Sequence, residues 1–189
     1  MRDLSLHVLD LVQNSVKAHA KLVVVEMSAD PARDRLTIVI EDDGDGMSEE
    51  LLARVKNPFT TTRTTRKVGL GIPLMEERAE LTGGGLTIQS KLGEGTRLET
   101  WLGLRHIDRP PLGDLAGTML TLVLATPETP DYVLRLHKPD FDFTFDTREI
   151  RQALGDVPLT TPEVVDWMRE SLGEGIGPFA QFDREDSSV

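Results

Sequence analysis

An apolar stripe at helical spacing, followed at once by two short β-branched runs, constrains the fold of this chain most. The stripe predicts an amphipathic helix over about residues 3–20, with its apolar positions at Leu4, Val8, Leu11, Val12 and Val16. The runs over residues 22–25 and 36–40 are typical of strands, and the turn-forming sequence SADPARD between them predicts an antiparallel hairpin. Because such a helix has to bury its stripe, we expect helices on one face of a mixed, mainly antiparallel sheet, an α+β two-layer sandwich.

Later segments continue this alternation of helices and strands. The expected elements are a helix that starts at Ser48 and ends before Asn57, a polar loop, a helix over 72–81, and strands over 86–90 and 96–104. The sequence HIDRPPLGD at 106–114 indicates a boundary. We therefore divide the chain into a core over 1–105 and an extension over 106–189, in which the pattern predicts a helix, a hairpin and two further helices.

Composition excludes several classes of function. The 189 residues carry a formal net charge of −11, and a nucleic-acid or anionic-membrane surface would need a basic face instead. The chain has no cysteine, which excludes disulfide frameworks, thiolate metal sites and cysteine nucleophiles. No apolar run approaches the roughly 20 residues that span a bilayer, and the amino terminus lacks a signal core, so we expect a cytoplasmic protein.

The amino-terminal helix carries a line of polar residues beside its apolar stripe. Asp10, Asn14 and Lys17 stand at i, i+4 and i+7, so they share one face. A carboxylate, an amide oxygen and an ammonium group in a row suit a magnesium triphosphate, because Mg²⁺ prefers oxygen ligands and the carboxylate can orient or deprotonate a nucleophile. The alternative is a solvated helix face with no ligand.

A glycine-interrupted acidic loop, DDGDG at residues 42–46, directly follows the second strand. A carboxylate at the end of a buried strand can accept a hydrogen bond from an exocyclic amine, and glycines allow close backbone approach. A calcium loop of the EF-hand type needs Glu at its twelfth position, which counted from Asp42 is Ala53. A plain turn stays open as the alternative.

A third segment, PFTTTRTTRKVGLG at residues 58–71, gathers hydroxyls, cations and glycines just before a helix start. Backbone N–H groups at a helix amino terminus form an anion site, aided by the helix dipole. The spacing is neither that of a Walker A loop nor that of a dinucleotide-binding fingerprint. Three cationic residues within five positions (63–67) predict an anionic partner in a chain of this net charge.

The order and spacing of these segments resemble the GHKL (Bergerat-fold) ATPase and kinase superfamily, over about residues 4–104, and most of all its histidine kinase-like domains. DLVQNSVKAHA resembles the N box, DDGDG the G1 box, NPFTTTR with GLGIPL the lid and G2 box, and GEGT at 93–96 the last element of the adenine pocket. The resemblance implies ATP and Mg²⁺ as cofactors, with Asn14 as the metal ligand and Asp42 as the adenine-binding carboxylate. The ATP-binding residues that it implies are Asn14, Lys17, Asp42, Gly44, Gly46, Met47, Thr60, Thr61, Thr62, Arg63, Lys67, Val68, Gly69, Leu70, Gly71 and Thr96.

Some positions depart from the family pattern. Asp10 occupies the place where ATP-hydrolysing relatives carry a catalytic glutamate, and we assign it the catalytic position. We expect a protein without a dimerisation helix and phosphoacceptor histidine before the domain, and His7 is expected to be structural. The family has a strand or hairpin before the N box, so the hairpin at 131–146 is expected either to complete the sheet from the other end or to form a separate partner-docking appendage.

The sequence thus predicts an ATP·Mg²⁺-binding, histidine kinase-like protein that phosphorylates a separate protein partner. Two alternatives remain. One is an ATP-dependent switch or slow ATPase that docks a partner protein. The other is a scaffold whose degenerate site holds no nucleotide.

Overall fold

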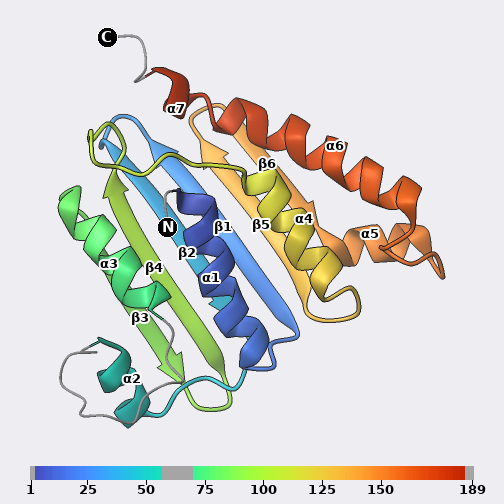
Figure 1. Ribbon diagram of the computed structural model, residues 1–189, viewed down its shortest axis with the longest axis horizontal. Helices are drawn as coiled ribbons and strands as arrows, with labels where there is room; N and C mark the ends of the chain where they lie inside the picture. The colour runs from blue at the N-terminus through green and yellow to red at the C-terminus, as the bar shows by residue number, and fades with distance from the viewer. Residues whose placement is uncertain (1–2, 57–69, 186–189) are drawn as a thin grey trace.

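Six strands form one sheet in the order β3-β4-β2-β1-β5-β6 in the computed structural model, which describes residues 3–56 and 70–185 (Figure 1). Neighbouring strands run antiparallel except β1 and β5, which are parallel. The strands are β1 (Leu22–Asp30), β2 (Arg35–Asp42), β3 (Gly85–Lys91), β4 (Gly95–Gly103), β5 (Asp131–Lys138) and β6 (Phe141–Asp146). The helices are α1 (Leu4–Lys17), α2 (Glu49–Lys56), α3 (Gly71–Leu81), α4 (Leu115–Ala125), α5 (Thr147–Leu154), α6 (Pro162–Phe179) and α7 (Phe182–Glu185).

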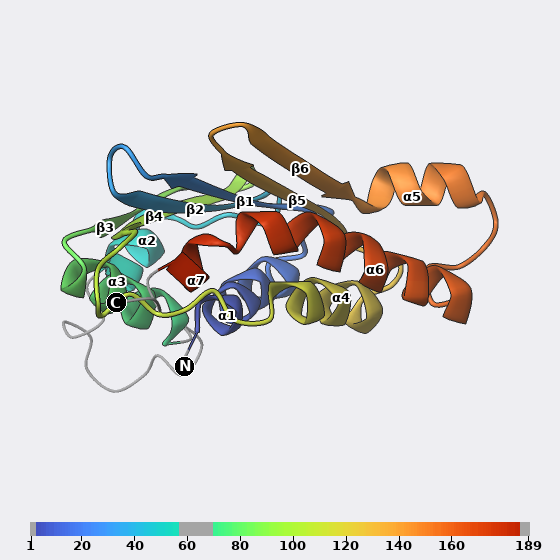
Figure 2. The ribbon, with the colours of Figure 1, turned by 90° about the horizontal axis from the view of Figure 1, so that it is seen from above.

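One face of the sheet carries a layer of helices, and Figure 2 shows the sheet edge-on above it. Alternation along β1 buries Val23, Val25 and Met27 completely, while the intervening residues are half-buried on the opposite face. Helix α1 lies over the centre of the sheet and buries Leu4, Val8, Leu11 and Val12 of its predicted stripe, while Val16 is half-buried. The expected α+β two-layer sandwich is confirmed.

Helix α1 begins where the chain between β4 and α4 crosses it. Asp3 caps the helix by accepting a hydrogen bond from the Leu6 N–H at 3.0 Å. The N–H groups of Leu4 and Ser5, which have no partner inside the helix, donate at 2.9 Å to the carbonyls of Pro111 and Leu112. The segment over 106–114 is therefore hydrogen-bonded to the start of α1 rather than separate from it.

The hairpin of β5 and β6 belongs to the same sheet as the amino-terminal strands. Strand β5 pairs with β1 in parallel, with Leu134 opposite Val25, and β6 forms the outer edge. Helices α4 and α6 extend the helical layer over these two strands, and α5 continues beyond the end of β6 (Figure 2). The hairpin at 131–146 thus completes the sheet and does not form a separate appendage. The division of the chain at residue 105 remains a prediction.

No helix among the described residues is both long and apolar enough to cross a membrane.

Candidate functional site

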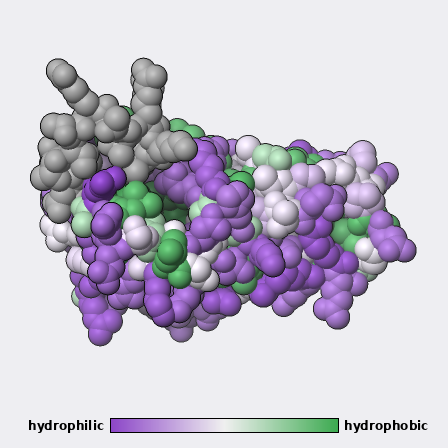
Figure 3. Space-filling view, turned by 90° about the horizontal axis from the view of Figure 1, so that it is seen from below, coloured by the Kyte–Doolittle hydropathy of each residue, from purple (hydrophilic) through white to green (hydrophobic). Residues whose placement is uncertain are grey.

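A cavity of about 310 Å³ opens at the end of the molecule where α1 finishes, between α2, α3 and strands β2 and β4. This α1 cavity is lined by Leu11, Asn14, Ser15, Lys17, Ala18, Ile40, Asp45, Gly46, Met47, Leu51, Val55, Ile72, Thr96 and Leu98. Figure 3 views this end, where apolar surface lies among polar surface. Five of the residues expected to contact a ligand line it: Asn14, Lys17, Gly46, Met47 and Thr96.

The inner walls of the α1 cavity are apolar. Ile40 from β2 and Leu98 from β4 lie side by side on the helix-facing side of the sheet and are 3% and 5% exposed. Met47 and Ile72 are partly buried around them. A slot with aliphatic walls suits a flat ring, provided that a polar group at its base matches the edge of the ring.

Ser15 lines the α1 cavity, whereas its hydrogen-bond partner Asp42, at the end of β2, is not among the lining residues. Oδ2 of Asp42 accepts a hydrogen bond from the hydroxyl of Ser15 at 2.5 Å, and its Oδ1 accepts one from the N–H of Gly44 at 3.0 Å. A carboxylate oxygen has two acceptor positions, so these two contacts fix the group and leave it able to accept another hydrogen bond. Ser15 is the residue that sequence reasoning missed; its place four residues after Leu11, on the buried side of α1, was the available signal.

The acidic loop is held against the β3–β4 hairpin. The Met47 N–H donates to the Ser90 hydroxyl at 2.8 Å, and the same hydroxyl lies 2.8 Å from the Thr96 hydroxyl. Gly46 has φ +66°, and a Cβ there would meet the Lys91 carbonyl oxygen at 2.0 Å. Packing of the acidic loop against β3 therefore requires a glycine here. The close approach of a ligand that was expected at Gly46 would be a second reason for the same residue.

Asn14 and Lys17 face the α1 cavity from the last turns of α1. Asn14 is half-buried and Lys17 is exposed. Within the part of the chain that the structure describes, neither side chain has a hydrogen bond or ion pair. The Asn14 amide oxygen and the Lys17 ammonium are thus free to bind a cation and an anion respectively.

Asp10 lies one turn before Asn14, against the start of α3. A Cβ placed on Gly71, the first residue of α3, would be 1.9 Å from Oδ2 of Asp10. Asp10 does not line the α1 cavity as it stands. Its carboxylate lies instead beside a helix amino terminus, where the dipole favours negative charge.

The remaining site residues fall into two groups. Leu70, directly before α3, is 71% exposed, and Gly44 is buried with its α-carbon against the Ala18 carbonyl. The predicted contacts Thr60, Thr61, Thr62, Arg63, Lys67, Val68 and Gly69 lie outside the described residues.

His7 is buried away from the α1 cavity. His7 is 1% exposed, and neither of its ring nitrogens has a hydrogen-bond partner among the described residues. Burial lowers the pKa of His7, and the charge of Arg78 lowers that pKa further, while Asp10 and Asp3 act in the opposite direction. The imidazole is therefore neutral at pH 7, in keeping with the structural role expected for it.

Comparison with known proteins gives one family and several relatives. The family described as histidine kinase-, DNA gyrase B- and HSP90-like ATPase matches residues 2–106. The non-motile and phage-resistance protein of Caulobacter vibrioides is 33% identical over 110 residues, which are 53% of this chain and 13% of that protein. The histidine protein kinase DivJ of the same organism is 35% identical over 99 residues, 50% of this chain and 17% of that one.

Among solved structures, the N-terminal domain of a DNA repair protein aligns with a TM-score of 0.49 and 14% identity, covering 77% of this chain and 52% of that one. The match with the two curated relatives spans less than a fifth of their length.

Proposed function

This chain belongs to the histidine kinase-, DNA gyrase B- and HSP90-like ATPase family, and from that premise we propose that it binds ATP with Mg²⁺ in the α1 cavity and transfers the γ-phosphate to a separate protein. The observation that carries this proposal is a cavity with apolar walls and two kinds of polar group. The Ser15 hydroxyl in its lining is hydrogen-bonded to the Asp42 carboxylate, and the Asn14 amide and Lys17 ammonium in the same lining have no partner among the described residues.

The slot fits adenine. The aliphatic side chains of Ile40, Met47 and Leu98 provide walls for the ring, and Asp42 provides an acceptor for the exocyclic amine. Ser15 and Gly44 hold the Asp42 carboxylate, so little rotational freedom is lost when the base binds. Thr96 is proposed to support the ring edge, and its hydroxyl is already positioned by Ser90.

The mouth of the cavity fits a magnesium triphosphate. Mg²⁺ is typically held by one or two protein oxygens together with phosphate oxygens, and the unpaired Asn14 amide oxygen is the protein ligand available here. The bound Mg²⁺ would neutralise charge on the phosphates. Lys17 is proposed to bind the phosphates, along with the segment from Thr60 to Gly71.

Asp10 is proposed to act on the attacking group. In the transfer, the acceptor oxygen bonds to the γ-phosphorus, the bond to the leaving ADP oxygen breaks, and the acceptor proton passes to the Asp10 carboxylate. Aspartate reaches one methylene less far than the glutamate of ATP-hydrolysing relatives. Its position beside Gly71, off the cavity wall, is the observation that favours a second candidate, an ATP-dependent switch in which the start of α3 moves when nucleotide binds.

Radiolabelled ATP distinguishes these functions. Calorimetry of the purified chain with ATP, with and without Mg²⁺, tests binding. Incubation with γ-labelled ATP, alone and with proteins of the source organism, then tests chemistry. Label on a partner protein that is lost when Asp10 is replaced by asparagine supports the kinase. Steady release of free phosphate supports the ATPase. Tight ATP binding with neither labelling nor phosphate release supports the switch. Absence of ATP binding at millimolar Mg²⁺ would contradict all three and favour the nucleotide-free scaffold.

A further inference from the structure

A second hollow lies at the opposite end of the molecule from the α1 cavity. A groove of about 300 Å³ runs between α5 and the first half of α6, at the end where α5 extends past the sheet (Figure 1). This α5–α6 groove is lined by Ile150, Ala153, Leu154, Glu163, Val164 and Trp167. It shares no residue with the α1 cavity.

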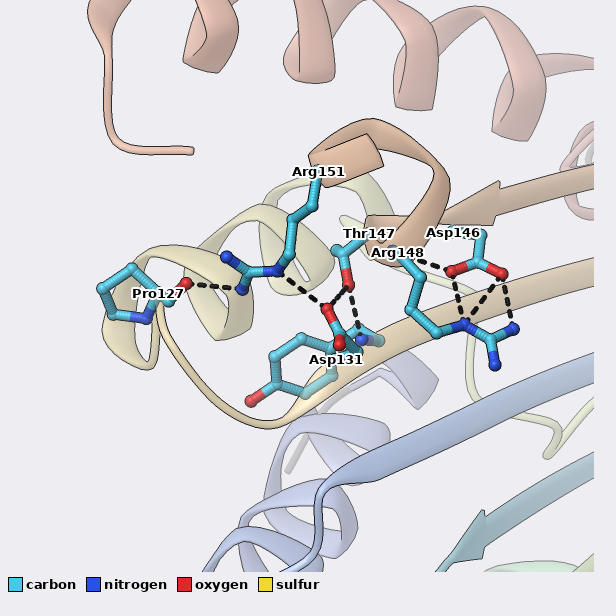
Figure 4. A network of polar contacts seen from close by, with 7 residues as sticks. Pro127, Asp131, Asp146, Thr147, Arg148 and Arg151 are labelled. Carbon is cyan, nitrogen blue, oxygen red and sulfur yellow. Dashed lines mark hydrogen bonds and ion pairs between the residues drawn. The ribbon is translucent and has the colours of Figure 1, made fainter. Parts of the chain in front are cut away.

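Polar contacts at the start of β5 fix the α5 wall of the groove (Figure 4). The Thr147 hydroxyl donates to Oδ1 of Asp131 at 2.8 Å and accepts from the Tyr132 N–H at 2.9 Å. Arg151 donates to the same Asp131 oxygen at 2.9 Å and to the Pro127 carbonyl at 2.5 Å. Because α5 is tied to the sheet at both of these residues, the groove is formed before anything binds in it.

The lining of the groove is apolar, and a large part of it faces water. Ile150 and Val164 form the floor and are 8% exposed each, whereas Trp167 is 52% exposed. Glu163 is the single charged residue in the lining. A site for a small metabolite needs several converging polar groups, which this lining lacks, while apolar side chains of another protein segment would bury Trp167.

The surroundings of the groove are acidic. Five carboxylates on α5, α6 and the turn between them have no ion-pair partner within the part of the chain that the structure describes: Glu149, Asp156, Glu163, Glu170 and Glu174. The arginines of the two helices already bind neighbouring aspartates, in the pairs Arg148–Asp146, Arg151–Asp131 and Arg169–Asp166. The free charge beside the groove is therefore negative.

We propose that the α5–α6 groove binds an amphipathic helix of a partner protein, with apolar residues at i, i+3 and i+4 and lysines or arginines beside them. Such a helix places apolar side chains against Val164 and Trp167 and its cations against the unpaired carboxylates. A second copy of this chain would bring two acidic rims together, and an anionic lipid surface would be repelled. The proposal does not depend on nucleotide binding.

Trp167 provides the readout for a test. The chain has two tryptophans, and Trp101→Phe leaves Trp167 as the sole indole. The probe is a 14-residue helical peptide of leucine and lysine with one apolar face, compared with the same peptide carrying glutamate in place of lysine. We expect the lysine peptide to give a saturable blue shift of Trp167 emission that weakens as salt rises, and the glutamate peptide to give none.

Charge alone could attract a basic peptide to this acidic chain, and two variants separate that effect from groove binding. Val164→Glu adds a negative charge inside the groove, so non-specific attraction would strengthen, whereas groove binding is expected to weaken by about tenfold or more. Gln89→Glu adds the same charge on β3, far from the groove, and is expected to leave binding unchanged. Val164 is buried, so its variant can fail to fold. Trp167→Glu repeats the test at an exposed position, and calorimetry measures peptide binding to this variant because its indole is gone.

Equal binding of both peptides, or undiminished binding by Trp167→Glu, would overturn the proposal. Self-association of the unmodified chain that Trp167→Glu abolishes would also overturn it, in favour of a second copy as the occupant. Loss of lysine-peptide binding in both groove variants, with Gln89→Glu unaffected, supports it.

Discussion

The hydroxyl of Ser15 donates to Oδ2 of Asp42 at 2.5 Å and so joins the last turn of α1 to the end of β2. One residue earlier in the same helix, Asn14 faces the α1 cavity. The two ends proposed for the nucleotide are therefore set by adjacent residues of one helix. A shift of α1 would move the adenine carboxylate and the metal ligand together.

Replacing Ser15 with alanine should weaken the binding of adenine nucleotides. The substitution removes one of the two hydrogen bonds that orient the Asp42 carboxylate, which is worth roughly 1 kcal/mol, or about fivefold in Kd. Calorimetric titration with ADP measures the change, and GDP serves as a base-specificity comparison. Ser5→Ala is the matched control, because the Ser5 hydroxyl bonds to Asp3 at the far end of the same helix. An unchanged Kd for Ser15→Ala would show that Asp42 needs no such support.

Asn14→Ala should remove the dependence of ATP binding on Mg²⁺. In the unmodified chain we expect ATP to bind roughly tenfold more tightly with Mg²⁺ than with EDTA, because the amide oxygen joins the coordination of the metal. In the variant the two affinities should converge, while ADP binding without metal stays as it was. Gln13→Ala, an exposed neighbour on α1, should retain the full Mg²⁺ effect. A variant that keeps that effect would exclude Asn14 as the ligand.

Gly71→Ala should destabilise the contact between α1 and α3. The new methyl group would lie 1.9 Å from Oδ2 of Asp10, so either the carboxylate or the start of α3 has to move, at a cost of about 1–3 kcal/mol in unfolding free energy. Gly173→Ala, inside α6 with no atom within 4 Å of the new methyl group, should instead stabilise the chain by about 0.5–1 kcal/mol. Urea denaturation measures both.

A double substitution tests whether the Gly71 effect acts through Asp10. Asp10→Ala in the Gly71→Ala background should recover most of the lost stability, because the carboxylate that collides with the methyl group is gone. If the two losses simply add, the strain lies elsewhere.

Local patterns predicted the layers of the fold through the stripe of α1 and the alternation of the strands. The motifs also predicted Asn14, which lines the α1 cavity, whereas the ligand roles of Asn14 and Asp42 stay predictions. Strand β1, in contrast, runs on to Asp30 beyond the predicted 22–25, because its later residues pair with β2 and bury Met27 and Ala29. Propensity along one strand does not contain that information.

The parts that sequence could not supply depend on residues distant along the chain. The hairpin at 131–146 was expected either in the sheet or as a separate appendage, and the choice rests on the parallel pairing of β1 with β5, which joins residues more than a hundred positions apart. The bond between Ser15 and Asp42 spans 27 positions; the place of Ser15 on the buried side of α1 indicates that its hydroxyl needs a partner but does not say which residue supplies it. The apolar walls of the α1 cavity have the same origin, because Ile40 and Leu98 look like ordinary core residues until the sheet places them side by side.

His7 should make the stability of the chain depend on pH between neutral and mildly acidic conditions. Burial lowers its pKa below 6.5, aided by Arg78 and opposed by Asp10 and Asp3, so the folded state takes up a proton less readily than the unfolded state does. Well above pH 6.5 both states carry a neutral imidazole and this contribution is constant. As the pH falls below 6.5 the unfolded chain gains a proton and stability drops, until the pKa of the folded state is reached.

One titrating group sets an upper limit to the slope of about 1.4 kcal/mol per pH unit. Urea unfolding between pH 7.5 and pH 5.5 measures that slope, and His7→Leu should flatten it because the variant has no proton to take up. Gln13→Ala, at an exposed position of the same helix without a titrating side chain, is the control and should keep the slope of the unmodified chain. A slope that survives His7→Leu would assign the pH dependence to other groups.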